Sequence, residues 1–496
     1  MDPWDRLASG LALSDPQLRH YANLARRLGD GYEELQALRP PRPQVVPATR
    51  EVGERPGSDD DPFHAIVRRC RVTAERSGPL EGMRIAVKDS IAVAGVPMTA
   101  GSAVLALTPS ADSTVVDRLL RAGAQIVATA NMDAFGCSGG GDTSAHGTIL
   151  NPHDTGRTAG GSSGGSAAAL SYPDIDAALG CDQAGSIRLP AAWCGVLGLK
   201  PTFGLVPYTR IMGLDRELDH VGPLARTVDD LARVLTVIAG PDVEDPRTRG
   251  VAAPAGYLAA CATPDVAGLR VGVLTEAVHA VQPPIAAAFA ESVSDLGRLG
   301  LVPVEISISE HRWGGAIAAG LYSEATANLF DYPGSACVPA WLELAEALDA
   351  GLRGNPAGLS PPVILSILMG RQTRERDRGA TYGLASLLRA PLSRAYDDAL
   401  GHVDVLAMPT APVAPHRIDP ELPADERLLR GWRIFANTSQ FNMTGHPALS
   451  MPAAAADGLP VGVMLVARHG DDALLLRIAA AFERRFGWRP ATKPAH

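Results

Sequence analysis

Lysine is scarce in this sequence, although positive charge is not. Lys88, Lys200 and Lys493 are the only lysines, and the other 42 of the 45 basic residues are arginines. A genome that favours arginine codons explains most of this bias. Arginine stays protonated in proteins, whereas a buried lysine can lose its proton and act as a base. Each remaining lysine is therefore a candidate for a position where arginine would fail.

The sequence also lacks the patterns of several broad classes of protein. No segment is long and apolar enough to span a bilayer, and the N-terminus has no charged-then-apolar signal. The formal net charge is −9 and there is no basic block, so no nucleic-acid partner is expected. The six cysteines include no Cys-x-x-Cys pair, as is usual for reduced thiols that bind no metal. We expect a cytoplasmic protein that binds neither membranes nor nucleic acid.

Composition divides the 496 residues into two unequal parts. Hydrophobic residues make up 46% and charged residues 20%, as in a globular protein with an ample core. Apolar residues recur at helical spacing within residues 1–38, and residues 39–62 are rich in proline, glycine and charge. We expect a helical extension and linker over 1–60, suited to packing or dimerisation, and one large domain over 61–496.

The large domain has the alternating pattern of an α/β fold. Residues 83–88 and 125–129 are typical of buried strands, and a helical pattern over 113–122 lies between them. This alternation predicts a large mixed sheet, mainly parallel, covered by helices. Further along the chain we expect a tightly packed helix at 166–170, a linker at 241–264, strands at 269–274 and 403–409, a mostly helical region over 280–400, and a closing helix at 471–486.

Glycine and serine are concentrated in residues 158–190, which points to unusual backbone beside hydroxyl groups. Residues 160–164 match the G-x-S-x-G elbow of α/β-hydrolases, but that elbow follows a strand, and 151–159 is polar and turn-rich. A phosphate-binding loop would need lysine where Ser166 stands. His146 and His153 do not form a metal-binding pair on a helix. Serine chemistry supported by backbone amides is the interpretation that remains.

Short motifs run from about residue 80 to the C-terminus. They are Ala86-Val87-Lys88-Asp89, Asn131-Met132-Asp133, Asn151-Pro152, Gly160-Gly161-Ser162-Ser163-Gly164-Gly165-Ser166-Ala167, Asp182-Gln183-Ala184-Gly185-Ser186-Ile187-Arg188, Pro190-Ala191, Cys194-Gly195, Gly198-Leu199-Lys200-Pro201-Thr202, Gly222-Pro223-Leu224-Ala225-Arg226, Met408-Pro409-Thr410 and Asn442-Met443-Thr444-Gly445-His446-Pro447. In order and spacing these motifs resemble the amidase signature family of serine hydrolases.

The resemblance implies a Ser–cis-Ser–Lys triad. Ser186 would be the nucleophile, Ser162 the bridging serine in a cis peptide bond, and Lys88 the base. The chemistry agrees, because a serine hydroxyl is a poor nucleophile until a base removes its proton. A lysine can be that base if burial lowers its pKa, and residues 85–87 give Lys88 apolar neighbours. Ser162 can accept a proton from Ser186 and pass one to Lys88.

The resemblance also implies where the negative charge of the reaction intermediate would be held. The backbone N–H groups of Gln183, Ala184, Gly185 and Ser186 would donate to the oxyanion, and Gly136 would leave room in the acyl pocket. Gln183-Ala184 departs from the commoner Thr-Gly of this motif. It resembles instead the branch of aliphatic and aryl amide hydrolases often encoded beside nitrile hydratases.

Other polar residues near these motifs have structural interpretations. We expect Arg188 to form an ion pair that holds its loop, Ser163 to form a hydrogen bond within the loop, and Lys200 to be structural. Cys137 and Cys181 are expected to be small buried thiols.

We therefore expect an amidase that hydrolyses a linear carboxamide to a carboxylic acid and ammonia or an amine through a Ser186 acyl-enzyme. It would act on a small molecule without a metal or organic cofactor, and as a homodimer. Two alternatives stay open: an amidotransferase subunit that releases ammonia within a partner complex, and a binding protein that has lost catalysis, although the intact triad argues against the second. The pocket walls, expected from 280–400 and 411–441, do not distinguish nitrile catabolism from tailoring of a biosynthetic intermediate.

Overall fold

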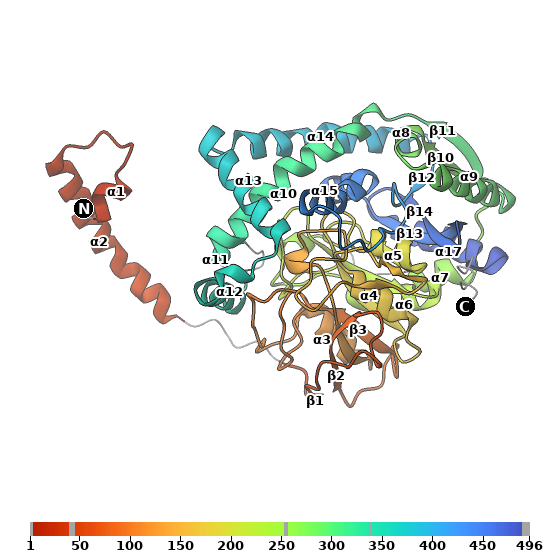
Figure 1. Cartoon of the computed structure of the whole chain (residues 1–496), viewed down its shortest axis with the longest axis horizontal. Coiled ribbons are helices and arrows are strands. Elements are labelled where there is room, and N and C mark those ends of the chain that lie inside the picture. The colour runs from red at the N-terminus through yellow and green to blue at the C-terminus, as the bar shows by residue number, and fades with distance from the viewer. Residues whose placement is uncertain (1–2, 39–44, 252–255, 337–339, 489–496) are drawn as a thin grey trace. The chain divides into compact units, whose positions relative to one another are not determined.

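The structure is a computed structural model that describes residues 3–38, 45–251, 256–336 and 340–488 (Figure 1). The chain separates into one unit over Met1–Gln44 and a second over Val45–His496. This division falls before the expected boundary at residue 60, because β1 (Thr49–Glu51) pairs with β2 (Ile66–Thr73) and so belongs to the large domain. In the described residues no helix is long and apolar enough to cross a membrane.

The first unit contains α1 (Pro3–Leu7) and α2 (Asp15–Ala37). The backbone N–H of Ser14 donates to Oε1 of Gln17 at 2.9 Å, which caps the start of α2. The helix leaves large apolar side chains exposed along its length: Tyr21, Leu24, Leu28, Tyr32 and Leu35.

The large domain is organised around a twelve-stranded sheet. In spatial order its strands are β1, β2, β4 (Gln125–Ala130), β3 (Arg84–Lys88), β7 (Ala177–Asp182), β9 (His220–Ala225), β8 (Leu197–Lys200), β13 (Ala448–Ala456), β14 (Leu459–Val466), β12 (Val405–Pro409), β10 (Arg270–Leu274) and β11 (Val302–Ile306). A separate two-stranded sheet pairs β5 (Leu150–Asn151) with β6 (Asp154–Thr158).

The sheet is mixed, as expected, but it is not mainly parallel. Among the described strands, four neighbouring pairs are parallel, namely β3 with β4, β3 with β7, β10 with β11, and β10 with β12, and the other seven are antiparallel. One reason is local: Asp457 and Gly458 both have positive φ, which suits a tight hairpin turn between β13 and β14. The strand–helix–strand alternation in the sequence indicates helical crossovers, and these connect parallel strands only. It carries no information about the antiparallel pairs.

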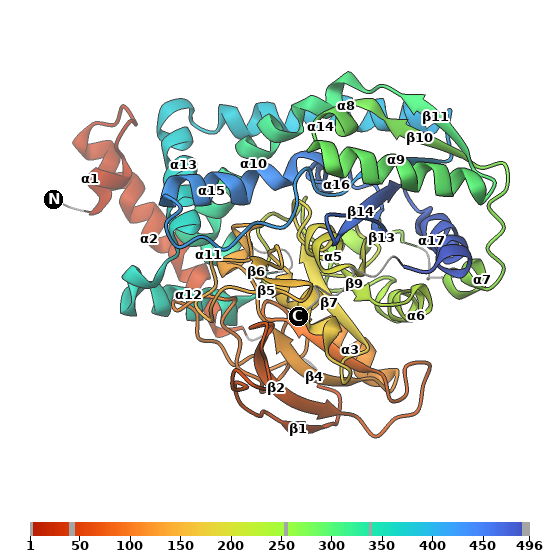
Figure 2. The same cartoon turned by 45° about the vertical axis from the view of Figure 1, so that its right-hand side comes forward.

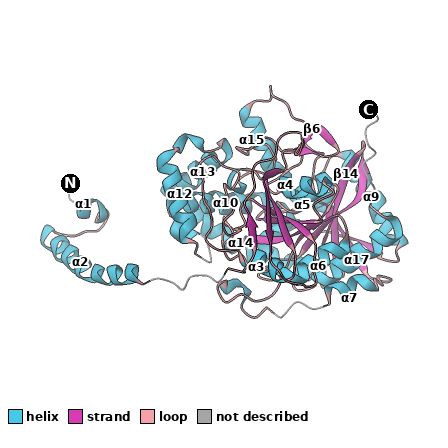
Figure 3. Cartoon of the chain, turned by 90° about the horizontal axis from the view of Figure 1, so that it is seen from below, coloured by secondary structure: helices cyan, strands magenta, loops and turns pink. Residues whose placement is uncertain are grey.

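Alternating residues of the central strands face two different hydrophobic clusters. Ile85 and Val87 of β3 pack in the cluster that contains α3 (Thr114–Arg121), α6 (Val228–Ile238) and α17 (Asp472–Phe486). Ala86 lies in a cluster with α4 (Gly164–Ala168) and α5 (Arg188–Cys194). Helices therefore cover both faces of the sheet (Figure 3).

The other helices of the large domain are α7 (Tyr257–Ala262), α8 (Thr275–His279), α9 (Pro283–Arg298), α10 (Gly314–Asp331), α11 (Pro333–Ala336), α12 (Leu342–Gly354), α13 (Pro361–Asp377), α14 (Ala380–Leu400), α15 (Ala424–Arg433) and α16 (Gln440–Thr444). Helix α10 packs against α13 and α14 (Figure 2). The helical prediction for 280–400 was right except for β11, and the expected linker at 241–264 contains α7.

Candidate active site

Lys88 is the last residue of β3, and its amine reaches the glycine–serine loop that precedes α4. Its Nζ donates to Oγ of Ser162 at 2.7 Å. Both side chains are buried, with 1% of Lys88 and none of Ser162 exposed. The peptide bond Gly161–Ser162 is cis, as the resemblance predicted. The structure thus brings together two residues that are 74 positions apart in the sequence.

The surroundings of Lys88 favour a neutral amine. Burial lowers the pKa of Lys88, and this effect outweighs Cys181, Asp133 and Asp182, which raise it. A lysine held in this way is a better proton acceptor near neutral pH than one in water.

Asp133 holds the backbone on which Ser162 lies. Its Oδ2 accepts the N–H of Gly141 at 2.9 Å, and its own N–H donates to the carbonyl of Ser162 at 3.2 Å. A Cβ on Gly161 would lie 1.9 Å from the same Oδ2, so this position has no room for a side chain. The glycine before Ser162 is therefore a packing requirement of the loop.

Ser186 lies between β7 and α5 and is 2% exposed. Its carbonyl accepts the N–H of Ser163 at 3.1 Å, which ties the two serine loops together. Just before it, Gly185 has φ of +139°, and a Cβ there would lie 2.2 Å from Oγ1 of Thr438. Glycine is needed at 185 for both reasons.

Each of the four peptide groups that lead up to Ser186 is held by a hydrogen bond to its carbonyl. The carbonyls of residues 182–185 each accept a hydrogen bond: Asp182 from Asn442 Nδ2 at 2.7 Å, Gln183 from the Tyr322 hydroxyl, Ala184 from Thr438 Oγ1 at 2.5 Å, and Gly185 from the Leu189 N–H at 2.8 Å. A trans peptide points its N–H opposite its carbonyl. The N–H groups of residues 183–186 donate to no acceptor among the described residues. In the sequence they form a row of four free donors that ends at Ser186 itself.

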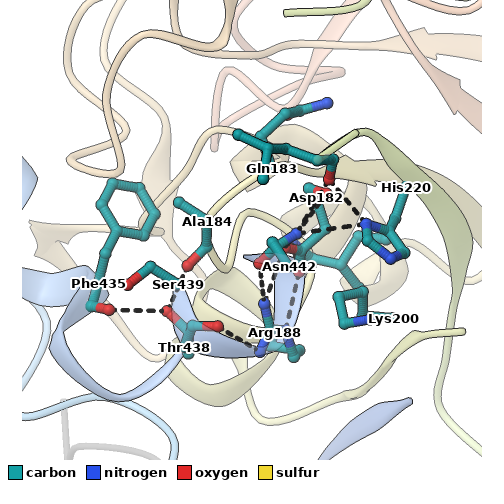
Figure 4. A network of polar contacts seen from close by, with 12 residues as sticks. Asp182, Gln183, Ala184, Arg188, Lys200, His220, Phe435, Thr438, Ser439 and Asn442 are labelled. Carbon is teal, nitrogen blue, oxygen red and sulfur yellow. Dashed lines mark hydrogen bonds and ion pairs between the residues drawn. The ribbon is translucent and has the colours of Figure 1, made fainter. Parts of the chain in front are cut away.

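A buried ion pair fixes both ends of this loop (Figure 4). Arg188 and Asp182 have fully buried side chains 2.9 Å apart, and Arg188 also donates to the carbonyl of Thr438 at 3.0 Å. Burial raises the pKa of Asp182, but Arg188 and Asn442 outweigh this effect and hold the pKa below its usual range. The carboxylate therefore stays charged, and the ion pair expected for Arg188 is present.

A cavity of about 340 Å³ opens onto Ser186, and three other predicted site residues, Gly136, Gln183 and Ala184, line it. Gly136 and Gln183 also line a smaller cavity beside Lys88. A Cβ on Gly136 would lie 3.5 Å from Oγ of Ser162. Gly136 thus links the two parts of the site, because it lies beside the hydroxyl of Ser162 and lines the same cavity as Ser186. Gly185 contributes its backbone but does not line the cavity.

The cavity walls are mainly apolar. They include Leu214, Gly315, Ala318, Ala319, Tyr322, Trp432 and Phe435. Two hydroxyls in the walls are already hydrogen-bonded to their own helices: Thr326 donates to the carbonyl of Tyr322 and Ser366 to that of Pro362. Arg433 is the only charged lining residue among those described; its side chain is 68% exposed and lies 3.6 Å from Glu426.

Ser163, Lys200 and Cys181 lie as the sequence suggested, whereas Cys137 is only half-buried and lines the cavity. Ser163 donates to the carbonyl of Cys181 at 3.0 Å, and Lys200 donates to the carbonyl of Pro201 at 3.0 Å. Burial raises the pKa of the Cys181 thiol, and it raises that of Cys137 to about 12. Both cysteines therefore remain protonated thiols.

One group of side chains in the described part of the chain has the composition of a metal site. Potential ligand atoms of Asp397, His446 and His469 lie within 4.8 Å of one another. A direct contact of 3.1 Å between Nε2 of His446 and Oδ1 of Asp397 accounts for this proximity as a hydrogen bond. None of the three lines the Ser186 cavity.

Comparison with known proteins agrees with this geometry. A family model described as Amidase matches residues 65–476. The chain is 38% identical to a subunit of the glutamyl-tRNA(Gln) amidotransferase of Halobacterium salinarum, over 85% of this chain and 100% of that one. It is also 38% identical to an enantioselective amidase of Rhodococcus rhodochrous, over 89% and 86%. The native peptide amidase of Stenotrophomonas maltophilia has the same fold, with a TM-score of 0.72 and 27% identity over 88% and 93%.

The chain therefore belongs to the amidase signature family of serine hydrolases, and it is an enzyme that acts on carbon–nitrogen bonds. Sequence reasoning missed three residues that hold the loop before Ser186: Tyr322, Thr438 and Asn442. Asn442 lies in a motif that the resemblance had already marked, but Tyr322 and Thr438 carry no sequence signal.

Proposed function

We propose that this chain hydrolyses linear carboxamides through an acyl-enzyme on Ser186. The single observation that supports this most strongly is the row of free N–H groups at residues 183–186, next to a serine and close to a Lys88–Ser162 hydrogen bond. Preorganised donors of this kind stabilise the oxyanion of acyl transfer.

In the proposed reaction, Oγ of Ser186 attacks the amide carbon while its proton passes to Ser162 and the proton of Ser162 passes to the neutral Lys88. The carbonyl oxygen becomes an oxyanion held by the free N–H groups. The C–N bond then breaks, and the leaving nitrogen takes back a proton through Ser162. Water hydrolyses the ester by the same proton path and releases the carboxylic acid.

We further propose that the substrate has an uncharged, bulky, apolar acyl group. The cavity offers aromatic and small aliphatic surface, and its one described charge is at an exposed arginine. An ammonium inside would lose water without gaining a partner, which costs several kcal/mol per ion. A carboxylate would find only Arg433, which is exposed and already lies beside Glu426. This favours a free-standing amidase, in catabolism or in tailoring of a biosynthetic intermediate, over an amidotransferase subunit that takes ammonia from an amino-acid amide.

Two proposals concern the context of the enzyme. We propose that it works in the cytoplasm, and as a homodimer that uses the exposed apolar side chains of α2. Deletion of residues 1–44 should then change the mass of the native protein, measured by light scattering, from dimer to monomer. A truncated protein that is still dimeric would place the interface elsewhere.

The test of function is ammonia release by the purified chain from phenylacetamide, benzamide, acetamide and L-glutamine. We expect the aryl amides to exceed L-glutamine in kcat/KM by about 10²-fold or more, since each 1.4 kcal/mol is a factor of ten. Ser186→Ala should abolish labelling by a fluorophosphonate probe, whereas Ser166→Ala, which removes a buried hydroxyl bonded to Leu179, should retain it. Ammonia release only in the presence of a partner protein would favour the amidotransferase.

A further inference from the structure

The free N–H row requires peptide groups that cannot rotate. A peptide between a glycine and a small residue turns easily, and a rotated peptide would present its carbonyl oxygen to the oxyanion. Of residues 183–185, which precede Ser186, two are the small residues Ala184 and Gly185. The sequence of the loop by itself therefore does not fix the orientation of its peptide groups. The restraint comes from elsewhere in the chain.

The Leu189 N–H holds the carbonyl of Gly185, and two hydroxyls supply the restraint at the two peptides before it. Tyr322 of α10 donates to the carbonyl of Gln183, which turns the Ala184 N–H the other way. Thr438 donates to the carbonyl of Ala184 at 2.5 Å and does the same for the Gly185 N–H. Burial raises the pKa of Tyr322 well above its usual value, so its hydroxyl keeps the proton that it donates.

We propose that Tyr322 and Thr438 are positioning residues that aim the oxyanion donors of this enzyme. This inference rests on the proposed acyl-transfer function and adds two residues to it. Tyr322 also lines the acyl cavity. A substrate packed against its ring therefore holds the hydroxyl on the Gln183 carbonyl, and acyl binding is coupled to the preparation of the oxyanion site.

The experiment compares Tyr322→Phe, Thr438→Ala and Thr438→Ser with the full-length wild type. Phenylalanine keeps the ring in the cavity wall, and serine keeps the threonine hydroxyl. We expect Tyr322→Phe and Thr438→Ala to lower kcat about tenfold with KM changed less than about twofold, a smaller loss than the 10²–10³ for removal of a direct oxyanion donor. Thr438→Ser should retain most of the activity.

A transition-state analogue separates positioning from a general structural defect. Phenylboronic acid forms a tetrahedral adduct with a serine, and its inhibition constant should weaken by the same factor as kcat/KM in Tyr322→Phe and Thr438→Ala. Tyr382→Phe is the matched control, because it removes a tyrosine hydroxyl bonded to Asp215 at 3.0 Å outside the cavity; it should change neither quantity.

An unchanged kcat in Tyr322→Phe, or a loss confined to KM, would overturn the proposal. So would boronate affinity that stays constant while kcat falls. A wild type that neither hydrolyses amides nor reacts with the fluorophosphonate would instead refute the proposed function itself.

Discussion

The two buried lysines, Lys88 and Lys200, have similar positions and different contacts. Each is the last residue of a strand in the same sheet, and each is at most 1% exposed. Burial lowers the pKa of both. Lys88 donates to the hydroxyl of Ser162, whereas Lys200 donates to the carbonyl of Pro201.

The two lysines differ in whether their hydrogen-bond partner can exchange a proton. A hydroxyl can give its proton to a neutral amine and take another from a neighbour, but a carbonyl has no proton to give. Lys200 lies close to the ion pair of Asp182 and Arg188 and near His220 (Figure 4). Burial therefore favours the neutral form of both lysines, and only Lys88 has a hydroxyl partner from which the proposed reaction could take a proton.

The largest effect expected from this comparison is at Lys88. Lys88→Met and Lys88→Arg should both lower kcat by about 10²–10⁴-fold, since methionine has no amine and arginine cannot become neutral. Single-turnover rates on phenylacetamide measure this, and circular dichroism checks that each variant is folded. Substantial activity in Lys88→Arg would contradict the proton path through the lysine.

The pH dependence separates the two lysines further. Lys88 must be neutral to accept a proton, so kcat/KM should fall about tenfold per pH unit below its pKa. Because burial lowers this pKa, the fall should begin below the pH near 10.4 expected for an exposed lysine. Lys200→Met should leave the midpoint of this fall unchanged. If the midpoint moves in Lys200→Met, the assignment of this titration to Lys88 is wrong.

The smallest effect is expected from Lys200→Met itself. The substitution keeps the apolar stem and removes an amine whose partner is one backbone carbonyl. We expect kcat/KM within about threefold of wild type and a change of about 1–2 kcal/mol in the free energy of unfolding, which urea denaturation measures. A loss as large as that of Lys88→Met would show that contact with Ser162 is not what distinguishes these lysines.

Much of the site could be predicted because its motifs are short and local. Residues 160–166 and 182–188 carry glycines at positions where the structure has no room for a side chain, and Lys88 ends a strand with an obvious apolar pattern. The prediction of a mainly parallel sheet was wrong, because strand direction depends on pairing between distant segments. Strands β13 and β14, which the sequence analysis did not predict, pair antiparallel with β8 and β12 and so add to the antiparallel share.

The sequence by itself determined the family, the candidate catalytic residues and the alternation of helices and strands, since each of these depends on the spacing of residues close together in the chain. Only the tertiary structure decided the restraints on the loop before Ser186. Tyr322 lies 139 positions from the Gln183 carbonyl that it holds, and Thr438 lies 254 from that of Ala184. Such contacts leave no periodic trace in the sequence, because a hydroxyl at any position can donate to a carbonyl once packing brings the two together.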